Sequence, residues 1–171
     1  MLIKDMPISN VEWIDVGLLE ANDYNPNVVF NNEFKLLKFS LLRQGWIQPV
    51  LVCRNNDKYT IIDGFHRSTL VKTDKEVREF TEGKVPVVVL DIDEAQRKCL
   101  TIRINRAKGS HIAVKMSDII KSLINEHGMS IKDICKEIGA TKDEVDLLMM
   151  DDVFKALDIE NKEFSKAWYP R

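Results

Sequence analysis

The stretch Tyr59-Thr-Ile-Ile-Asp-Gly-Phe-His-Arg67 decides the fold of the first half of this chain. Residues 59–62 are β-branched and aromatic, which predicts a strand that Gly64 ends. A helix is predicted to begin at Arg67, so a strand, a glycine and a helix N-terminus follow one another. Backbone N–H groups at a helix N-terminus point outward and favour anions. The order of these parts predicts a phosphate-binding turn.

The side chains of this turn suit the same chemistry. His66 and Arg67 add donors, and the guanidinium fork of arginine matches a phosphate. Asp63 stands beside them as a candidate base or metal ligand. The pattern has a second interpretation, because Asp-Gly after a strand is also a hairpin signal and a His-Arg pair is ordinary on a surface. The local pattern leaves both interpretations open.

Composition narrows the class of protein. The chain has 171 residues, with 25 basic against 27 acidic side chains and a net charge of −2. This balance argues against a broad electrostatic grip on DNA. The three cysteines are far apart and form no CxxC pair, so neither a disulfide framework nor a zinc site is indicated. The sequence shows no signal-peptide pattern and no apolar run of membrane-spanning length, so we expect a cytoplasmic protein without membrane contact.

Hydrophobic patterning divides the chain into a mixed part and a helical part. The pattern predicts strands over 11–16, 48–53, 59–62 and 85–90, and helices over 31–43, from 67 onward, and from a cap at Asp93 to about 104. Strands 48–53 and 59–62 are predicted to form a hairpin. Four strands mixed with helices over residues 1–112 predict an α/β or α+β domain.

From residue 113 onward the pattern is wholly helical. Helices are expected over 116–126, 131–138 and 142–150, with Ser130 and Thr141 as N-caps and Gly139 in the turn between the last two. This is the spacing of a helix-turn-helix. We place this domain at residues 113–157 and a C-terminal tail at 158–171.

The third of these helices does not suit DNA. Lys142 faces five acidic residues nearby, which are Asp143, Glu144, Asp146, Asp151 and Asp152. Such a helix repels phosphates, so a helical bundle that packs on the first domain or on a second subunit is favoured over reading of the major groove. Any DNA contact would then fall to the basic segments 103–108 or 166–171.

The order of these motifs resembles the ParB/sulfiredoxin superfamily, in particular ParB-type N-terminal domains followed by a helix-turn-helix. The resemblance covers about residues 11–150. Asn25-Pro26 matches the family's Asn-Pro loop, Gly45-Trp-Ile-Gln-Pro49 its Gly-x-x-Gln-Pro segment, and Gly64-Phe-His-Arg67 its Gly-x-x-Arg box. It implies a small mixed sheet with helices that binds a nucleotide (ATP, ADP or CTP, with or without Mg²⁺). It also implies a homodimer.

The resemblance assigns roles to individual residues. Nucleotide contacts are expected from Gln48, Gly64, Phe65, Arg67 and Ser68 on one side, and from Arg103, Asn105 and Arg106 in the segment that closes over the nucleotide in ParB proteins. Asp63, His66 and Asp23 are the candidate catalytic residues, and Asp63 is also the candidate metal ligand.

Departures from the family pattern restrict the chemistry. Sulfiredoxins need a cysteine where this chain has Phe65, so their reaction is not expected. ParB proteins supply a Glu-Asn pair to the metal, and Ile102 and Arg103 stand at those positions, where the arginine would replace the charge of the metal. In the alternative interpretation, Arg103 and Arg106 pair with acids such as Glu94 and only hold their helix.

Three functions remain open from the sequence. The first is a nucleotide-responsive regulator of gene expression or DNA maintenance in a mobile element or prophage, working with a protein partner. The second is a phosphoryl-transfer enzyme, either an NTPase or nuclease or a small-molecule kinase. The kinase interpretation rests on a resemblance to free-serine kinases, which share Asp-Gly-x-His-Arg and use an acid in the loop where this chain has Asp23. The third is an interaction module that retains the fold without a ligand.

Overall fold

The computed structural model describes residues 2–22, 31–107 and 113–150. The chain divides into two compact units, residues 1–93 and 94–171. Contacts group the helix after Asp93 with the later helices, whereas the sequence pattern places this helix in the first domain. The domain boundaries near 112 and 157 stay predictions.

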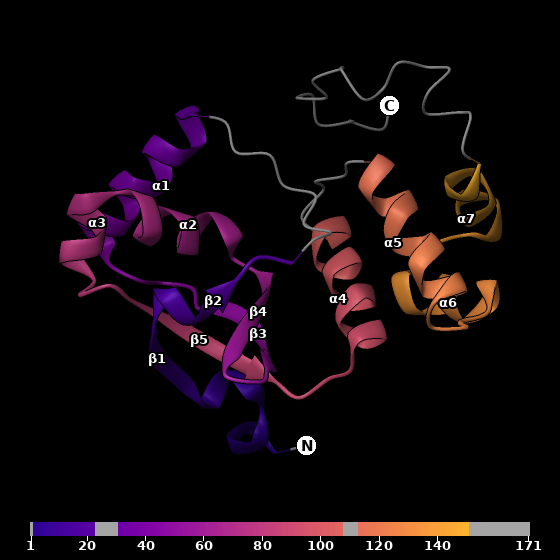
Figure 1. The fold of residues 1–171 in the computed structure, drawn as a ribbon, viewed down its shortest axis with the longest axis horizontal. Coiled ribbons are helices and arrows are strands. Elements are labelled where there is room, and N and C mark those ends of the chain that lie inside the picture. Colours follow the sequence, from indigo (N-terminus) through magenta and orange to yellow (C-terminus); the bar gives the residue numbers. More distant parts are fainter. Residues whose placement is uncertain (1, 23–30, 108–112, 151–171) are drawn as a thin grey trace. The chain divides into compact units, whose positions relative to one another are not determined.

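One mixed sheet forms the first unit (Figure 1). Within the described residues it has five strands, which are β1 (Val11–Asp15), β2 (Leu19–Glu20), β3 (Val50–Asn55), β4 (Lys58–Asp63) and β5 (Lys84–Leu90). Their order in the sheet is β1-β5-β3-β4-β2. The β1–β5 and β3–β4 pairs are antiparallel, and the β3–β5 and β2–β4 pairs are parallel. The predicted hairpin is present, with Asn55 opposite Lys58 and Asn56 in the left-handed conformation that asparagine tolerates in such turns.

Three helices lie on the same side of this sheet, and Figure 1 shows them together. They are α1 (Asn31–Gln44), α2 (Phe65–Thr73) and α3 (Lys75–Phe80). The core between the helices and the sheet is aliphatic and includes Leu41, Val50, Ile61, Val71 and Val87. Burial of such side chains contributes about 1.5–3 kcal/mol each, so this core stabilises the unit that carries the predicted turn.

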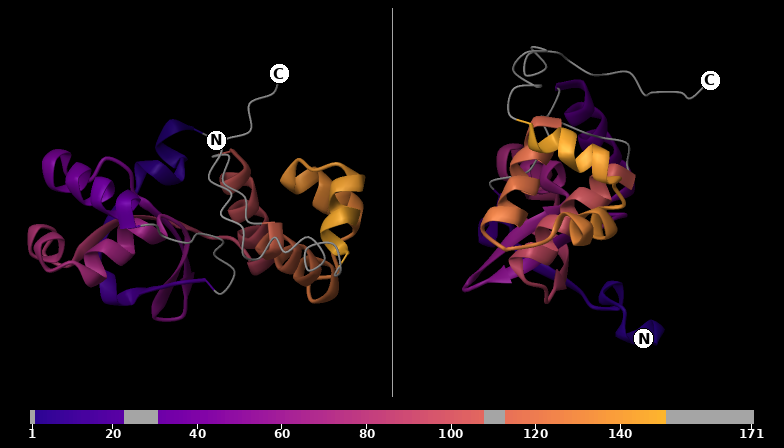
Figure 2. Two further views of the ribbon diagram at one scale, coloured as in Figure 1. Left: turned by 90° about the horizontal axis from the view of Figure 1, so that it is seen from above. Right: turned by 90° about the vertical axis from the view of Figure 1, so that its right-hand side faces the viewer.

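Four helices form the described part of the second unit: α4 (Glu94–Ala107), α5 (Ala113–Asn125), α6 (Ile131–Ile138) and α7 (Lys142–Met149). The hydroxyl oxygens of Ser130 and Thr141 accept the N–H groups of Asp133 and Glu144, so both predicted N-caps are confirmed. Gly139 ends α6 in the left-handed conformation. Figure 2 shows these short helices from two further sides. The α+β fold class is confirmed, whereas the helix-turn-helix and its packing as a bundle rather than as a reader of DNA stay predictions.

Candidate functional site

The predicted strand, glycine and helix follow one another as expected. Strand β4 ends at Asp63, Gly64 is the N-cap residue of α2, and the helix begins at Phe65. Gly64 has φ +96°, and a Cβ placed there would lie 3.0 Å from Nη2 of Arg67 and 3.0 Å from Cγ2 of Val50. A glycine is therefore required both for its backbone conformation and for its lack of a side chain.

The N-terminus of α2 has no side-chain cap. The first bond along the helix joins Ser68 N–H to the Gly64 carbonyl at 3.1 Å, and Gly64 has no side chain to accept the earlier N–H groups. The dipole of the helix favours negative charge at this end. The turn therefore has an uncapped helix N-terminus, and its role as an anion site stays a prediction.

Arg67 points into the protein. Its side chain is 13% exposed, and it lies next to an equally buried Asp63, with 3.3 Å between Nη2 and the Asp63 Oδ2 atom. Nη1 donates to the backbone carbonyls of Gln48 and of Pro49, the latter at 2.9 Å. Burial lowers the pKa of the Arg67 guanidinium, and Asp63 opposes that shift. The described contacts of Arg67 thus join α2 to the segment before β3, and its role as a phosphate ligand stays a prediction.

The other predicted residues of this turn differ in their accessibility. The His66 ring packs between aromatic neighbours, with its centroid 6.2 Å from that of Phe34 and 6.0 Å from that of Phe65. Ser68 is buried, and its hydroxyl donates to the Phe65 carbonyl at 2.8 Å, inside the helix. Gln48 is exposed. Gln48 is thus accessible at the turn and His66 is half-buried with its Nε2 atom enclosed, whereas the Ser68 hydroxyl already has an internal acceptor.

Two arginines of the second unit, which are predicted to contact the nucleotide, are paired with acidic residues of neighbouring helices. Arg103 pairs with Glu137 of α6 at 3.3 Å, and Arg106 binds Glu144 of α7 through both guanidinium nitrogens. Arg106 also donates to the Gly139 carbonyl at 3.2 Å. Asn105 is buried. These contacts fit the alternative interpretation, in which the two arginines hold their helix in place. The acidic partners are Glu137 and Glu144 rather than Glu94.

Catalysis and metal binding stay predictions. Asp23 lies outside the described residues. Asp63 lies beside Arg67, and no group of three or more His, Cys, Asp or Glu side chains in the described ranges is arranged to hold a metal ion.

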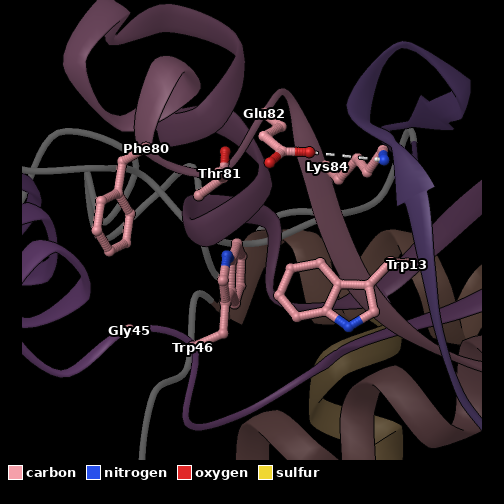
Figure 3. Close-up of a pocket in the computed structure, with 7 residues that line it drawn as sticks. All are labelled: Trp13, Gly45, Trp46, Phe80, Thr81, Glu82 and Lys84. Carbon is pink, nitrogen blue, oxygen red and sulfur yellow. Dashed lines mark ion pairs between the residues drawn. The ribbon is translucent and has the colours of Figure 1, made fainter.

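Sequence reasoning did not find an aromatic pocket of about 470 Å³ in the first unit (Figure 3). Its aromatic walls are Trp13 of β1, Trp46 of the loop before β3, and Phe80 at the end of α3. Figure 3 shows the three rings side by side, with Glu82 and Lys84 at the rim. Only the presence of tryptophan in a short strand and in a loop signalled this pocket in the sequence.

Comparison with known proteins agrees with this fold. The model of the ParB N-terminal domain family matches residues 3–105. Escherichia coli YbdM, an uncharacterized protein, is 35% identical over 166 residues, which cover 96% of this chain and 78% of YbdM. A probable chromosome-partitioning protein ParB from Borreliella burgdorferi is 27% identical over 152 residues, and the match covers 88% of this chain and 54% of that protein.

A solved structure has the same fold. The C-terminally truncated chromosome-partitioning protein ParB from Caulobacter crescentus, complexed to the centromeric parS site, aligns with a TM-score of 0.54 and 20% identity, and the alignment covers 89% of this chain and 80% of that one. Among the described residues, no helix is both long and apolar enough to cross a membrane. With a family model that matches well over half of its length, the chain belongs to the ParB N-terminal domain family.

Proposed function

We propose that this protein is a ParB-like, nucleotide-binding regulator that binds nucleotide phosphates at the turn from Gly64 to Arg67. The observation that carries the proposal is the N-terminus of α2, where a left-handed glycine leaves the helix without a side-chain cap. Membership of the ParB N-terminal domain family supports it, because the matched region includes this turn. The regulator acts on gene expression or DNA maintenance in the cytoplasm, in a mobile element or prophage, and through a protein partner.

The second unit supports a partner-dependent role more than direct reading of DNA. Helix α7 carries Asp143, Glu144 and Asp146 against Lys142, and Arg106 is already paired with Glu144. Lys142 is the single cation of α7 against three carboxylates, so this helix is unfavourable to DNA phosphates. Nucleotide binding is proposed to change the affinity for the partner, with DNA contact left to the basic segments outside α7.

The test is a calorimetric titration with ATP, ADP and CTP, each with and without Mg²⁺. His66→Glu is the informative variant, because a carboxylate in the first turn stabilises the helix and repels a phosphate. His66→Gln is the matched control, since the glutamine side chain is as long as that of glutamate and carries no charge. We expect saturable binding by the wild type, a loss of about tenfold or more in affinity in His66→Glu, and much smaller loss in His66→Gln.

Two results would overturn the proposal: no nucleotide saturates the wild type, or the two His66 variants bind equally well. Turnover of the bound nucleotide, abolished in Asp63→Asn, would instead identify a phosphoryl-transfer enzyme.

A further inference from the structure

The aromatic pocket of the first unit brings three rings and two opposite charges together. Trp13, Trp46 and Phe80 form its walls, and Glu82 and Lys84 lie at its rim (Figure 3). Its volume of about 470 Å³ falls within the range of about 300–1,000 Å³ that is typical of small-molecule sites. None of these residues belongs to the turn proposed for nucleotide phosphates, so the pocket is a separate candidate site.

The aromatic walls are both accessible and held in place. Trp13 is 56% exposed and Phe80 is 53% exposed, so a ligand can cover much of either side chain. Trp46 is half-buried and packs against the aliphatic core of the unit. The backbone of Trp13 is fixed opposite Pro86 by the pairing of β1 with β5. Covering aromatic surface favours binding, and fixed walls reduce the entropy that a ligand must overcome.

The faces of these rings are available to a cation. Among the described residues, the cations that lie over an aromatic ring are Arg43 on Phe39 and Arg54 on Tyr59, and both of these rings lie outside the pocket. The negative face of a tryptophan ring attracts a cation, and several rings together recognise quaternary ammonium groups. The aromatic walls therefore suit an alkylated ammonium group.

Glu82 stands at a position where the fold itself favours another residue. It follows Thr81, the C-cap of α3, and has φ +54°, a left-handed conformation that is uncommon outside glycine and asparagine. Its carboxylate also lies at the C-terminal end of a helix, where the dipole favours a cation. Residues held in such conformations are concentrated at ligand sites. A role in binding accounts for the glutamate better than stability does.

The two charges at the rim lie close together but bind each other weakly. Oε2 of Glu82 and Nζ of Lys84 are 3.8 Å apart, and the side chains are 82% and 52% exposed. An exposed ion pair of this length contributes little to stability, so each group can exchange its partner for a charge on a ligand. Opposite charges this close match a ligand whose own two charges are separated by one or two atoms.

We propose that the aromatic pocket binds a small zwitterion that carries a methylated ammonium group. The ammonium group lies among the rings beside Glu82, and the carboxylate of the ligand meets Lys84. Lys84 repels a ligand that is only a cation, whereas Glu82 and the faces of the rings repel a ligand that is only an anion. The zwitterion is the ligand that satisfies both rim charges and the aromatic walls.

Tryptophan fluorescence tests the ligand class with three probes. The chain has three tryptophans, so a Trp168→Phe background leaves Trp13 and Trp46 as the reporters. Glycine betaine is the zwitterion. 3,3-Dimethylbutanoate has the same shape but carbon in place of the charged nitrogen, and choline keeps the ammonium group but lacks the carboxylate. We expect betaine to saturate the fluorescence change with a Kd of about 1 mM or tighter, and both other probes to bind about tenfold more weakly. The proposal is wrong if betaine does not saturate the signal, or if either other probe binds as tightly.

Variants at the rim assign the two charges of the ligand. Glu82→Gln should weaken betaine binding about tenfold, and Lys84→Met should weaken betaine but strengthen choline, because it removes a repelling cation. Glu79→Gln is the matched control, since Glu79 is 70% exposed, pairs with Lys75 at the same distance of 3.8 Å and lies outside the pocket. Circular dichroism confirms that all three variants fold. Equal betaine binding by Glu82→Gln and Glu79→Gln, or an equal effect of Lys84→Met on betaine and choline, would overturn the proposal.

Discussion

Arg67 shows, at the scale of single residues, how a binding motif and a structural contact overlap. The sequence presents it as a phosphate ligand, whereas its guanidinium binds the carbonyls of Gln48 and Pro49 and lies beside Asp63. The contacts with Pro49 and Asp63 are partly buried, so removal of the arginine would leave the Pro49 carbonyl and the Asp63 carboxylate without their cation. The loss of a ligand by an Arg67 variant would therefore not separate binding from folding, which is why His66 is the better position to test.

We expect Arg67→Ala to lower the free energy of unfolding by about 3 kcal/mol, because it breaks a buried ion pair and strands two carbonyls. Arg67→Lys should recover only part of this loss, since an ammonium cannot reproduce the guanidinium fork. Urea denaturation monitored by circular dichroism measures both. An Arg67→Ala protein within about 0.5 kcal/mol of the wild type would contradict the structural role.

The stability of a short helix depends on the contacts at its ends, and the six-residue helix α3 is an example. The Asp74 carboxylate accepts the Val77 N–H at 3.1 Å and binds Lys38 of α1 at 2.7 Å. The hydrogen bond from Lys38, followed by that from Val77, lowers the pKa of Asp74 below its ordinary value. Asp74 therefore both begins α3 and holds it to α1.

The acid dependence of this contact has a definite sign. Because the folded-state pKa of Asp74 is depressed, its contribution is fully present above about pH 4 and is lost as the pH falls through the folded-state value. We expect Asp74→Ala to cost about 1 kcal/mol at pH 7 and less near pH 2. Asp74→Asn should keep most of the cap and lose the charge. Urea melts at the two pH values give the comparison, and a cost for Asp74→Ala that does not shrink in acid would exclude the carboxylate as the source.

Helices α4 and α5 are joined by Lys98, whose side chain is only 7% exposed. Its Nζ atom lies 2.7 Å from Ser122 Oγ, 2.9 Å from Glu94 Oε1 and 3.5 Å from Glu126 Oε2. The pKa of Glu94 is lowered chiefly by its hydrogen bond from Lys98. The ammonium thus links one carboxylate of α4 to a hydroxyl of α5.

Lys98→Met keeps the length of this side chain and removes its charge. We expect a loss of about 1–2 kcal/mol in the free energy of unfolding, a value reduced because both carboxylates are more than half exposed. Lys132→Met on α6 is the exposed control and should change stability by less than about 0.5 kcal/mol. Chemical denaturation measures both variants, and equal effects would show that the Lys98 contacts are not stabilising.

Each compact unit of the whole molecule has an aliphatic core of its own. In the first unit the core lies between the sheet and α1–α3, and in the second it includes Ile120, Leu123 and Ile134. A unit with its own core is expected to fold alone.

We expect the fragment 1–93 to unfold cooperatively in urea, with a free energy of about 3–5 kcal/mol and a β-containing circular dichroism spectrum. The fragment 94–171 provides the helical counterpart, and the two spectra should sum to that of the full chain. A fragment 1–93 without a cooperative transition would show that the first unit needs the second.

The sequence by itself determined the elements whose signals are local. Such elements depend on the conformation of one residue and its immediate neighbours. They are the hairpin at Asn56, the end of α1 at Gly45, and the caps at Ser130 and Thr141. Strand β2 and helix α3 were missed because they are too short to show a period. Strand β2 exists because it pairs with β4, which lies about 40 residues away along the chain.

Only the tertiary structure decided which partners the charged side chains have. The guanidinium groups of Arg67, Arg103 and Arg106 bind groups between 4 and 38 positions away. A sequence pattern records the type of a side chain but not the direction in which packing turns it. The turn at Gly64 could be predicted because a turn sets its own geometry, whereas the burial of Arg67 and the place of β1 at an edge follow from strand order in the sheet.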